Sequence, residues 1–93
     1  MNTKSYYMYV LLCADGTLYC GYTDNVTRRF KAHQSYQGAK YTRVKSRHPL
    51  QLLYQEKFNS KHNALSAEYH FKHQPRDKKL GYLKKHGINI NNL

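Results

Sequence analysis

The sequence predicts a small α+β domain in which a mostly antiparallel three-stranded sheet is flanked by helices, in the order ββαβαα. Two β-prone runs surround an Asp-Gly turn signal near the start of the chain, and a third apolar run follows Pro49. Segments with helical periodicity and capping residues follow the second and third runs. Because 93 residues leave room for only one core, we expect a single domain over residues 1–87 and a loose tail over 88–93.

The first two strands are expected over residues 6–13 and 17–21, and the length of the loop between them decides which side chains share a face of the sheet. One option is a two-residue turn. This turn would place Tyr9 opposite Tyr22, so that Tyr9 and Tyr19 would lie on opposite faces and could not share a site.

The other option is a three-residue loop over residues 14–16, which would place Tyr9 opposite Gly21 and bring Tyr9 and Tyr19 to the same face. We favour this loop because Gly16 then occupies the left-handed position of a bulge, where glycine is preferred. A glycine opposite Tyr9 would also leave open space beside the phenol.

In the favoured register, Cys13 lies on the tyrosine face and Cys20 on the other face, so we do not expect a disulfide between them. Two free thiols and no recognisable secretory signal favour a reducing compartment, and we expect a cytoplasmic protein. No apolar run approaches the length of a membrane span, so we expect no membrane partner.

A helix is predicted over residues 26–34, after polar residues that can cap it. Val26, Arg29, Phe30 and His33 recur at helical spacing. Arg29 and His33 should therefore lie along the apolar stripe that faces the sheet.

The second half of the chain supplies the remaining elements. Residues 50–58 predict the third strand, and residues 61–74 predict a helix. A last helix is expected over residues 76–86, with Leu80 and Leu83 facing inward.

The charge balance predicts a polyanionic partner. Sixteen Lys and Arg residues against five Asp and Glu give a net charge of +11, and the isoelectric point is near 9.8. We expect that partner to be a nucleic acid. If the basic connection over residues 37–47 is extended, it presents one cationic edge. The candidate nucleic-acid contacts are Lys40, Tyr41, Arg43, Lys45, Arg47 and Arg28.

One of the five acids stands out. Four have ordinary roles in a turn, at helix starts or at a solvated strand end: Asp15, Asp24, Asp77 and Glu56. Glu68 lies on a predicted helix face beside Leu65 and Phe71, where a carboxylate needs a cation. A metal ion and Arg29 are equally good candidates for that cation. The scarcity of acids excludes a two-metal nuclease, whereas one Mg²⁺ with mostly water ligands remains compatible.

At these residues the chain resembles the GIY-YIG nuclease superfamily, over nearly its whole length. Residues 7–9 (Tyr-Met-Tyr) stand where Gly-Ile-Tyr would be, and residues 19–21 (Tyr-Cys-Gly) stand where Tyr-Ile-Gly would be. Arg29 falls at the helix arginine of that family, His33 at the following His or Tyr, and Glu68 at the metal-binding glutamate.

The chain also departs from the family pattern at two positions. Tyr7 replaces the glycine of the first motif, and Tyr22 stands where repair-type members often have lysine. Residues 38–43 (Gly-Ala-Lys-Tyr-Thr-Arg) look like those of the small stand-alone bacterial members.

The resemblance implies a metal-dependent endonuclease that hydrolyses phosphodiester bonds in DNA, nicking single-stranded or structured substrates. It implies DNA rather than RNA as the partner and a monomer, since a single catalytic set fits single-strand nicks. It implies catalytic roles for Tyr9, Tyr19, Arg29 and His33, with Glu68 holding one Mg²⁺ or Mn²⁺ ion. A tyrosine or His33 would act as the base, and Arg29 would bind the phosphate. The alternative is a DNA- or RNA-binding module of the same fold without hydrolysis, based on the cations of residues 37–47.

Overall fold

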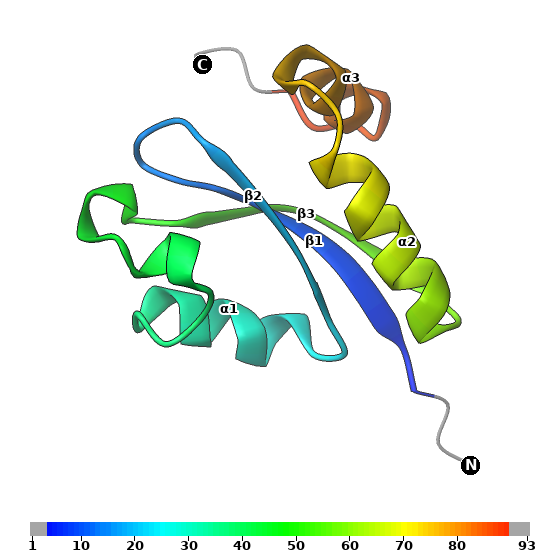
Figure 1. Ribbon diagram of the computed structural model, residues 1–93, viewed down its shortest axis with the longest axis horizontal. Helices are drawn as coiled ribbons and strands as arrows, with labels where there is room; N and C mark the ends of the chain where they lie inside the picture. Colours follow the sequence, from blue (N-terminus) through cyan, green and yellow to red (C-terminus); the bar gives the residue numbers. More distant parts are fainter. Residues whose placement is uncertain (1–3, 90–93) are drawn as a thin grey trace.

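A computed structural model describes residues 4–89, in which three strands form one sheet between helices (Figure 1). All strand pairs are antiparallel, and the strand order is β2-β1-β3. This arrangement confirms the predicted α+β class and element order. Along the chain the elements are β1 (Tyr6–Leu12), β2 (Leu18–Thr23), α1 (Val26–Gln34), the 3₁₀ turns η1 (Lys40–Arg43) and η2 (Lys45–Arg47), β3 (Gln51–Phe58), α2 (Lys61–Lys72) and α3 (Arg76–Lys85).

The hairpin of β1 and β2 has the three-residue loop that the sequence favours. Tyr9 pairs with Gly21, and Leu11 pairs with Tyr19. Gly16 has a φ of 84°, in the left-handed region that suits glycine. Tyr9 and Tyr19 therefore project from the same face of the sheet, as predicted.

The central strand β1 is buried on both faces, which gives the domain two apolar layers. Met8 and Val10 pack toward Phe71 of α2 and Leu83 of α3. On the opposite face, Tyr9, Leu11, Cys13 and Leu50 form a second cluster. Figure 1 shows the corresponding arrangement, with α1 and the green connection on one side of the strands and α2 on the other.

The two cysteines follow the same division. Cys13 belongs to the cluster around Tyr9, whereas Cys20 belongs to the cluster around Met8. Both thiols are free and buried, as the hairpin register predicts.

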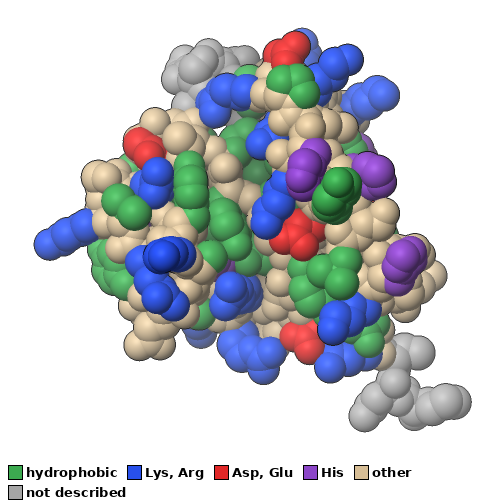
Figure 2. Space-filling view, viewed as in Figure 1, with side chains coloured by type: hydrophobic (Ala, Val, Ile, Leu, Met, Phe, Trp, Pro, Cys, Tyr) green, Lys and Arg blue, Asp and Glu red, His purple; other side chains and the backbone are tan. Residues whose placement is uncertain are grey.

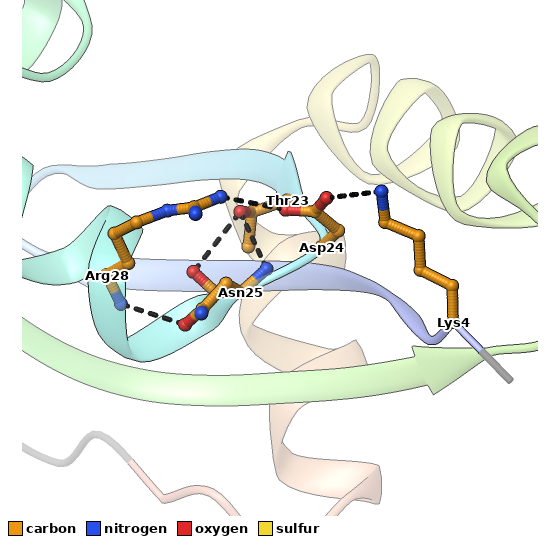
Figure 3. A network of polar contacts seen from close by, with 5 residues as sticks. All are labelled: Lys4, Thr23, Asp24, Asn25 and Arg28. Carbon is orange, nitrogen blue, oxygen red and sulfur yellow. Dashed lines mark hydrogen bonds and ion pairs between the residues drawn. The ribbon is translucent and has the colours of Figure 1, made fainter. Parts of the chain in front are cut away.

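The start of α1 is held by a network of polar contacts (Figure 3). The Asn25 side chain is the cap and accepts a hydrogen bond from the Arg28 amide at 3.0 Å. The Thr23 hydroxyl accepts a hydrogen bond from the Asn25 amide at 3.1 Å. Asp24 has a different role, since it pairs with Lys4 at 3.0 Å and with Arg28 at 3.2 Å.

The connection over residues 37–47 differs from the extended form considered above. It folds into η1 and η2, so that its alternate cations do not line one edge. The amide of Ala14 in the hairpin loop donates to the carbonyl of Arg47 at 2.8 Å, which ties the end of the connection to the sheet.

The third strand contains an irregularity that periodicity does not reveal. Val10 pairs with Tyr54 but Leu11 pairs with Leu52, so Leu53 is an extra residue in β3. As a result the neighbours Leu53 and Tyr54 both pack against the cluster around Met8, whereas Leu52 packs against the cluster around Tyr9.

Two smaller expectations are wrong. Glu56 is not simply solvated, because its carboxylate accepts hydrogen bonds from Tyr54 at 2.8 Å and Tyr82 at 2.5 Å. Leu65 is 40% exposed and does not share the buried face of α2. Ile88, in the expected tail, packs against the cluster around Met8, and residues 90–93 of that tail lie outside the described part.

Within residues 4–89 no helix combines the length and the apolar character needed to cross a bilayer. Each of the three α-helices is instead short and packed beside the sheet.

We expect Leu83→Ala to lower the free energy of unfolding by about 2–5 kcal/mol, the usual cost of removing a large buried apolar side chain. Leu83 is fully buried and anchors α3. Leu80→Ala, at a half-buried position of the same helix, is the matched control and should cost less. Urea denaturation followed by circular dichroism measures both; equal losses would contradict the role of Leu83 as the anchor.

Candidate active site

The site is centred on a chain of hydrogen bonds that joins the sheet, α1 and η1. The Tyr9 hydroxyl lies 2.7 Å from Nε2 of His33, and Nδ1 of His33 lies 2.6 Å from Oγ1 of Thr42. The Thr42 hydroxyl donates its own proton to the carbonyl of Ala39 at 3.0 Å. Tyr9, His33 and Thr42 are all buried.

These contacts determine which nitrogen of His33 carries the proton. Because the only proton of the Thr42 hydroxyl goes to Ala39, its oxygen must accept a hydrogen bond from Nδ1 of His33. Nε2 of the neutral ring is then unprotonated and accepts the hydrogen bond from Tyr9. His33 is thus oriented as an acceptor for the Tyr9 proton.

Two glycines make this packing possible. A Cβ atom at Gly21 would lie 2.5 Å from the Tyr9 hydroxyl, and a Cβ atom at Gly38 would overlap Nδ1 of His33. Glycine at both positions lets the backbone approach the two rings closely.

Tyr19 completes an aromatic cluster beside this chain. Its ring centre lies 5.3 Å from that of His33, edge to face, and 6.4 Å from that of Tyr9. Tyr19 is half-buried, whereas Tyr9 and His33 are buried. Of these three rings, Tyr19 is the one that a substrate could reach.

Arg29 on α1 supplies positive charge to the same place. Burial raises the pKa of Tyr9, and hydrogen bonding and charge from Arg29 act in the opposite direction. Burial first, and then the charges of Arg29 and His48, lower the pKa of His33 to about 4. The structure therefore brings Tyr9, Tyr19, Arg29 and His33 together, on the face of the sheet that α1 covers.

Glu68 lies on α2, which packs on the other side of the sheet (Figure 1). Its side chain is 17% exposed, and Oε2 lies 3.1 Å from Nζ of Lys72. The pKa of Cys20 rises to about 12, chiefly through burial and then through the charge of Glu68, which places the carboxylate near β2. Among the described residues the cation paired with Glu68 is Lys72, so the Glu68–Arg29 pair considered above is wrong.

Lys72 connects Glu68 to the tyrosine cluster. Its Nζ atom lies 5.7 Å from the centre of the Tyr19 ring while it pairs with Glu68. Because β2 is an edge strand, a side chain on α2 can reach past it toward the tyrosine side of the sheet. We infer that Glu68 lies beside this edge, with Lys72 between its carboxylate and Tyr19.

The donor set around Glu68 limits the kind of metal that could bind. Residues 4–89 contain no group of three or more His, Cys, Asp or Glu side chains arranged to hold an ion. A single carboxylate fits Mg²⁺ or Mn²⁺ with mostly water ligands, and it does not fit zinc or a two-metal centre. The ion pair with Lys72, whose side chain is 43% exposed, is a weak competitor.

The candidate nucleic-acid contacts divide into two groups. Arg28, Lys40, Arg43 and Lys45 are exposed. Arg47 and Tyr41 instead make internal contacts: the Arg47 guanidinium carbon lies 3.8 Å from the centre of the Tyr41 ring, and Nε lies 3.2 Å from Asp15. The other neighbour of Tyr41 is Tyr19, at 5.8 Å between ring centres.

Sequence analysis missed Thr42 and Lys72. Thr42 lies in the Gly38–Arg43 segment that was noted for its resemblance, but nothing local shows that it contacts His33 nine residues earlier. Lys72 stands four residues after Glu68, a spacing typical of helical ion pairs, and this spacing could have identified it.

The chain was compared with known proteins. The model of the family described as "GIY-YIG catalytic domain" matches residues 5–81. A UPF0213 protein of Limosilactobacillus reuteri is 62% identical over 90 residues, covering 97% of this chain and 94% of that protein. A UPF0213 protein of Lactiplantibacillus plantarum is 61% identical over 87 residues, covering 94% and 86%.

Two solution NMR structures are similar as well. A protein from E. faecalis is 43% identical, with a TM-score of 0.64 and coverage of 99% of this chain and 96% of that one. A UPF0213 protein from Bacillus halodurans is 42% identical, with a TM-score of 0.60 and coverage of 89% and 86%. The fold and most of the chain length are therefore shared with these proteins.

We expect stability to fall by about 2 kcal/mol between pH 7 and pH 5, because the pKa of His33 is near 6.5 when unfolded and about 4 when folded. In this window the unfolded state takes up the proton more readily, so stability is lost as the pH falls. Urea denaturation at several pH values measures the slope.

His33→Gln should remove this pH dependence, whatever its effect on stability at pH 7. His62→Gln, at an exposed position of α2, is the control and should retain the slope. Asp15 and Asp24 contribute little to the change in stability between pH 7 and pH 5, because their carboxyl pKa values are lowered from 3.8. An unchanged slope in His33→Gln would contradict the assignment.

Proposed function

The chain belongs to the GIY-YIG family, and on that premise we propose that it is a metal-dependent endonuclease that hydrolyses phosphodiester bonds in DNA. The observation that carries this proposal is the 2.7 Å hydrogen bond from Tyr9 to His33 beside the charge of Arg29. A buried proton acceptor next to a guanidinium offers general base catalysis and phosphate binding at one place.

The three rings have distinct proposed roles. Tyr19 is accessible and orients the attacking water. Because Tyr9 is buried, the attacking water would have to enter beside Tyr19 to reach the Tyr9 hydroxyl, which would take its proton as the Tyr9 proton passes to Nε2 of His33. Thr42 holds the His33 ring in the tautomer that can accept it.

Arg29 links substrate binding to this proton transfer. Its guanidinium binds the scissile phosphate and offsets the charge that develops in the transition state. In the free protein the same charge helps to keep the pKa of His33 low. A phosphate bound to Arg29 would offset that charge and make His33 a stronger base where the substrate is bound.

Glu68 is the proposed ligand of one Mg²⁺ or Mn²⁺ ion, with Lys72 moving away from the carboxylate. When bound, the ion would polarise a phosphate oxygen and offset charge on the leaving 3′ oxygen. Lys72 would remain close to Tyr19, where its ammonium can contact the same phosphate.

The exposed cations Arg28, Lys40, Arg43 and Lys45 are the proposed contacts to the DNA backbone. On the face shown in Figure 2, Lys and Arg side chains predominate over acidic ones. With one set of catalytic groups per chain, we propose a monomer that nicks one strand at a time.

A DNA- or RNA-binding module without hydrolysis is the second candidate. The observation in its favour is that Lys72 already neutralises Glu68, so the carboxylate has a partner without a metal ion. Such a protein would bind nucleic acid through the same exposed cations and would show salt-sensitive affinity.

We expect the purified protein to cleave DNA with Mn²⁺ at low salt, and expect Glu68→Ala and Arg29→Ala each to reduce the rate by about 10²–10³-fold. Single-stranded, duplex and branched DNA are incubated in parallel and separated on denaturing gels. Lys84→Ala, which removes an exposed lysine of α3, is the control and should cleave normally.

The outcomes separate the two candidates. Cleavage that survives in Glu68→Ala would point to a contaminant or to a wrong ligand. Salt-sensitive binding by the wild type with no cleavage in any divalent metal would favour the binding module.

Lys72→Met should raise the affinity for Mn²⁺ several-fold, because it removes the cation that competes for Glu68. Electron paramagnetic resonance of free Mn²⁺ measures binding without any substrate. Lys84→Met loses the same charge far from Glu68 and should change the affinity less. Equal affinities for Lys72→Met and wild type would contradict competition at Glu68.

A further inference from the structure

An exposed aromatic pair lies beside the site and has no role in the proposed chemistry. The rings of Tyr36 and His48 lie in contact, 4.1 Å apart between centres and tilted by 32°. Tyr36 is 43% exposed although it is a large aromatic residue. The exposed part of the Tyr36 ring, away from His48, is available to a partner.

The backbone at Tyr36 is unusual in a way that points to function. Its φ is 64°, in the left-handed region, and Tyr36 is the only residue other than glycine with positive φ among residues 4–89. It directly follows Ser35, the last cap residue of α1, at the position where helices commonly have glycine. A strained tyrosine with an exposed ring is better explained by binding than by packing.

The pair borders a hollow that carries positive charge. The hollow has a volume of about 460 Å³, within the ~300–1,000 Å³ range of small-ligand sites. Lys45, an exposed cation of η2, stands in its wall. The lining residues are Gln34, Tyr36, Lys45, His48, Pro49 and Leu50.

The hollow is connected to the proposed proton acceptor through one residue. Nε2 of His48 hydrogen-bonds to the carbonyl of Thr42 at 2.7 Å. The side chain of the same Thr42 accepts the hydrogen bond from Nδ1 of His33. A ligand that contacts Tyr36 and His48 would therefore be linked through His48 to Thr42, a member of the hydrogen-bond chain of the site.

Tyr41, the one aromatic residue among the candidate nucleic-acid contacts, is poorly placed to stack on a base. Arg47 covers its ring at 3.8 Å, and Tyr19 stacks on it at 5.8 Å. Tyr36 carries the exposed ring of this region instead.

We propose that Tyr36 and His48 form a stacking site for an unpaired nucleobase of the DNA strand, with Lys45 holding a neighbouring phosphate. Base stacking on aromatic rings beside cations is how single strands are commonly bound, and it tolerates any base. The inference rests on the proposed function and narrows it: the substrate is DNA with an unpaired base next to the cleaved bond.

A single-stranded DNA oligonucleotide carrying 2-aminopurine tests this site. Stacking quenches the fluorescence of 2-aminopurine, and EDTA in the buffer prevents cleavage. We expect quenching by the wild type and an affinity about tenfold lower for Tyr36→Gly, the usual size of a lost base stack. Glycine accepts a φ of 64° without strain, so this variant should fold at least as well.

Tyr69→Ala is the matched control. Tyr69 is 59% exposed and stacks on His73 at 4.0 Å, but it lies on α2 and does not border the hollow. Its loss should leave the affinity nearly unchanged. A fully paired duplex with the same label should show no quenching that depends on Tyr36.

Several results would overturn the inference: equal affinities for Tyr36→Gly and wild type, equal losses for Tyr69→Ala and Tyr36→Gly, or tighter Tyr36-dependent binding of RNA than of DNA. Its failure is distinguishable from failure of the proposed function. If the protein cleaves DNA normally but Tyr36→Gly binds as tightly as wild type, only the proposed stacking site is wrong. If binding depends on Tyr36 but no cleavage occurs with Mn²⁺, only the proposed hydrolysis is wrong.

Discussion

The structure depends on the buried hydrogen-bond chain from Tyr9 through His33 to Thr42. It connects the central strand, α1 and the basic connection, three segments that are separate in sequence. Polar groups without contact to water must find partners inside the protein, so this chain holds the three segments in one arrangement. The same contacts set the His33 tautomer, and thus the fold and the proposed chemistry share one interaction.

The acids of this chain are mostly engaged in short-range contacts. Asp15 pairs with Arg47, Asp24 with Lys4 and Arg28, and Glu68 with Lys72, while two tyrosine hydroxyls bind Glu56. The exposed pairs contribute little to stability and can exchange partners easily. A net charge of +11 therefore remains available to attract a polyanion, and Arg28 and Lys72 can transfer from a carboxylate to a phosphate.

Local signals predicted most of the fold. Gly16 and the run of β-prone residues around it indicated the loop length, and the observed pairing of Tyr9 with Gly21 followed from it. The spacing of Val26, Arg29 and His33 placed the last two on the sheet-facing side of α1. The extra residue Leu53 escaped prediction, because a bulge changes which residues pair without changing their types.

The sequence by itself determined the register of the β1–β2 hairpin, the helices and the positions of Tyr9, Tyr19, Arg29 and His33 on one side, since each follows from spacing within a short stretch. The tertiary structure decided the partners: Thr42 for His33, Lys72 for Glu68, Arg47 for Tyr41 and His48 for Tyr36. Several of these partners depend on how the connection over residues 37–47 folds back on the sheet. Such contacts join residues without a common period, so no local pattern encodes them.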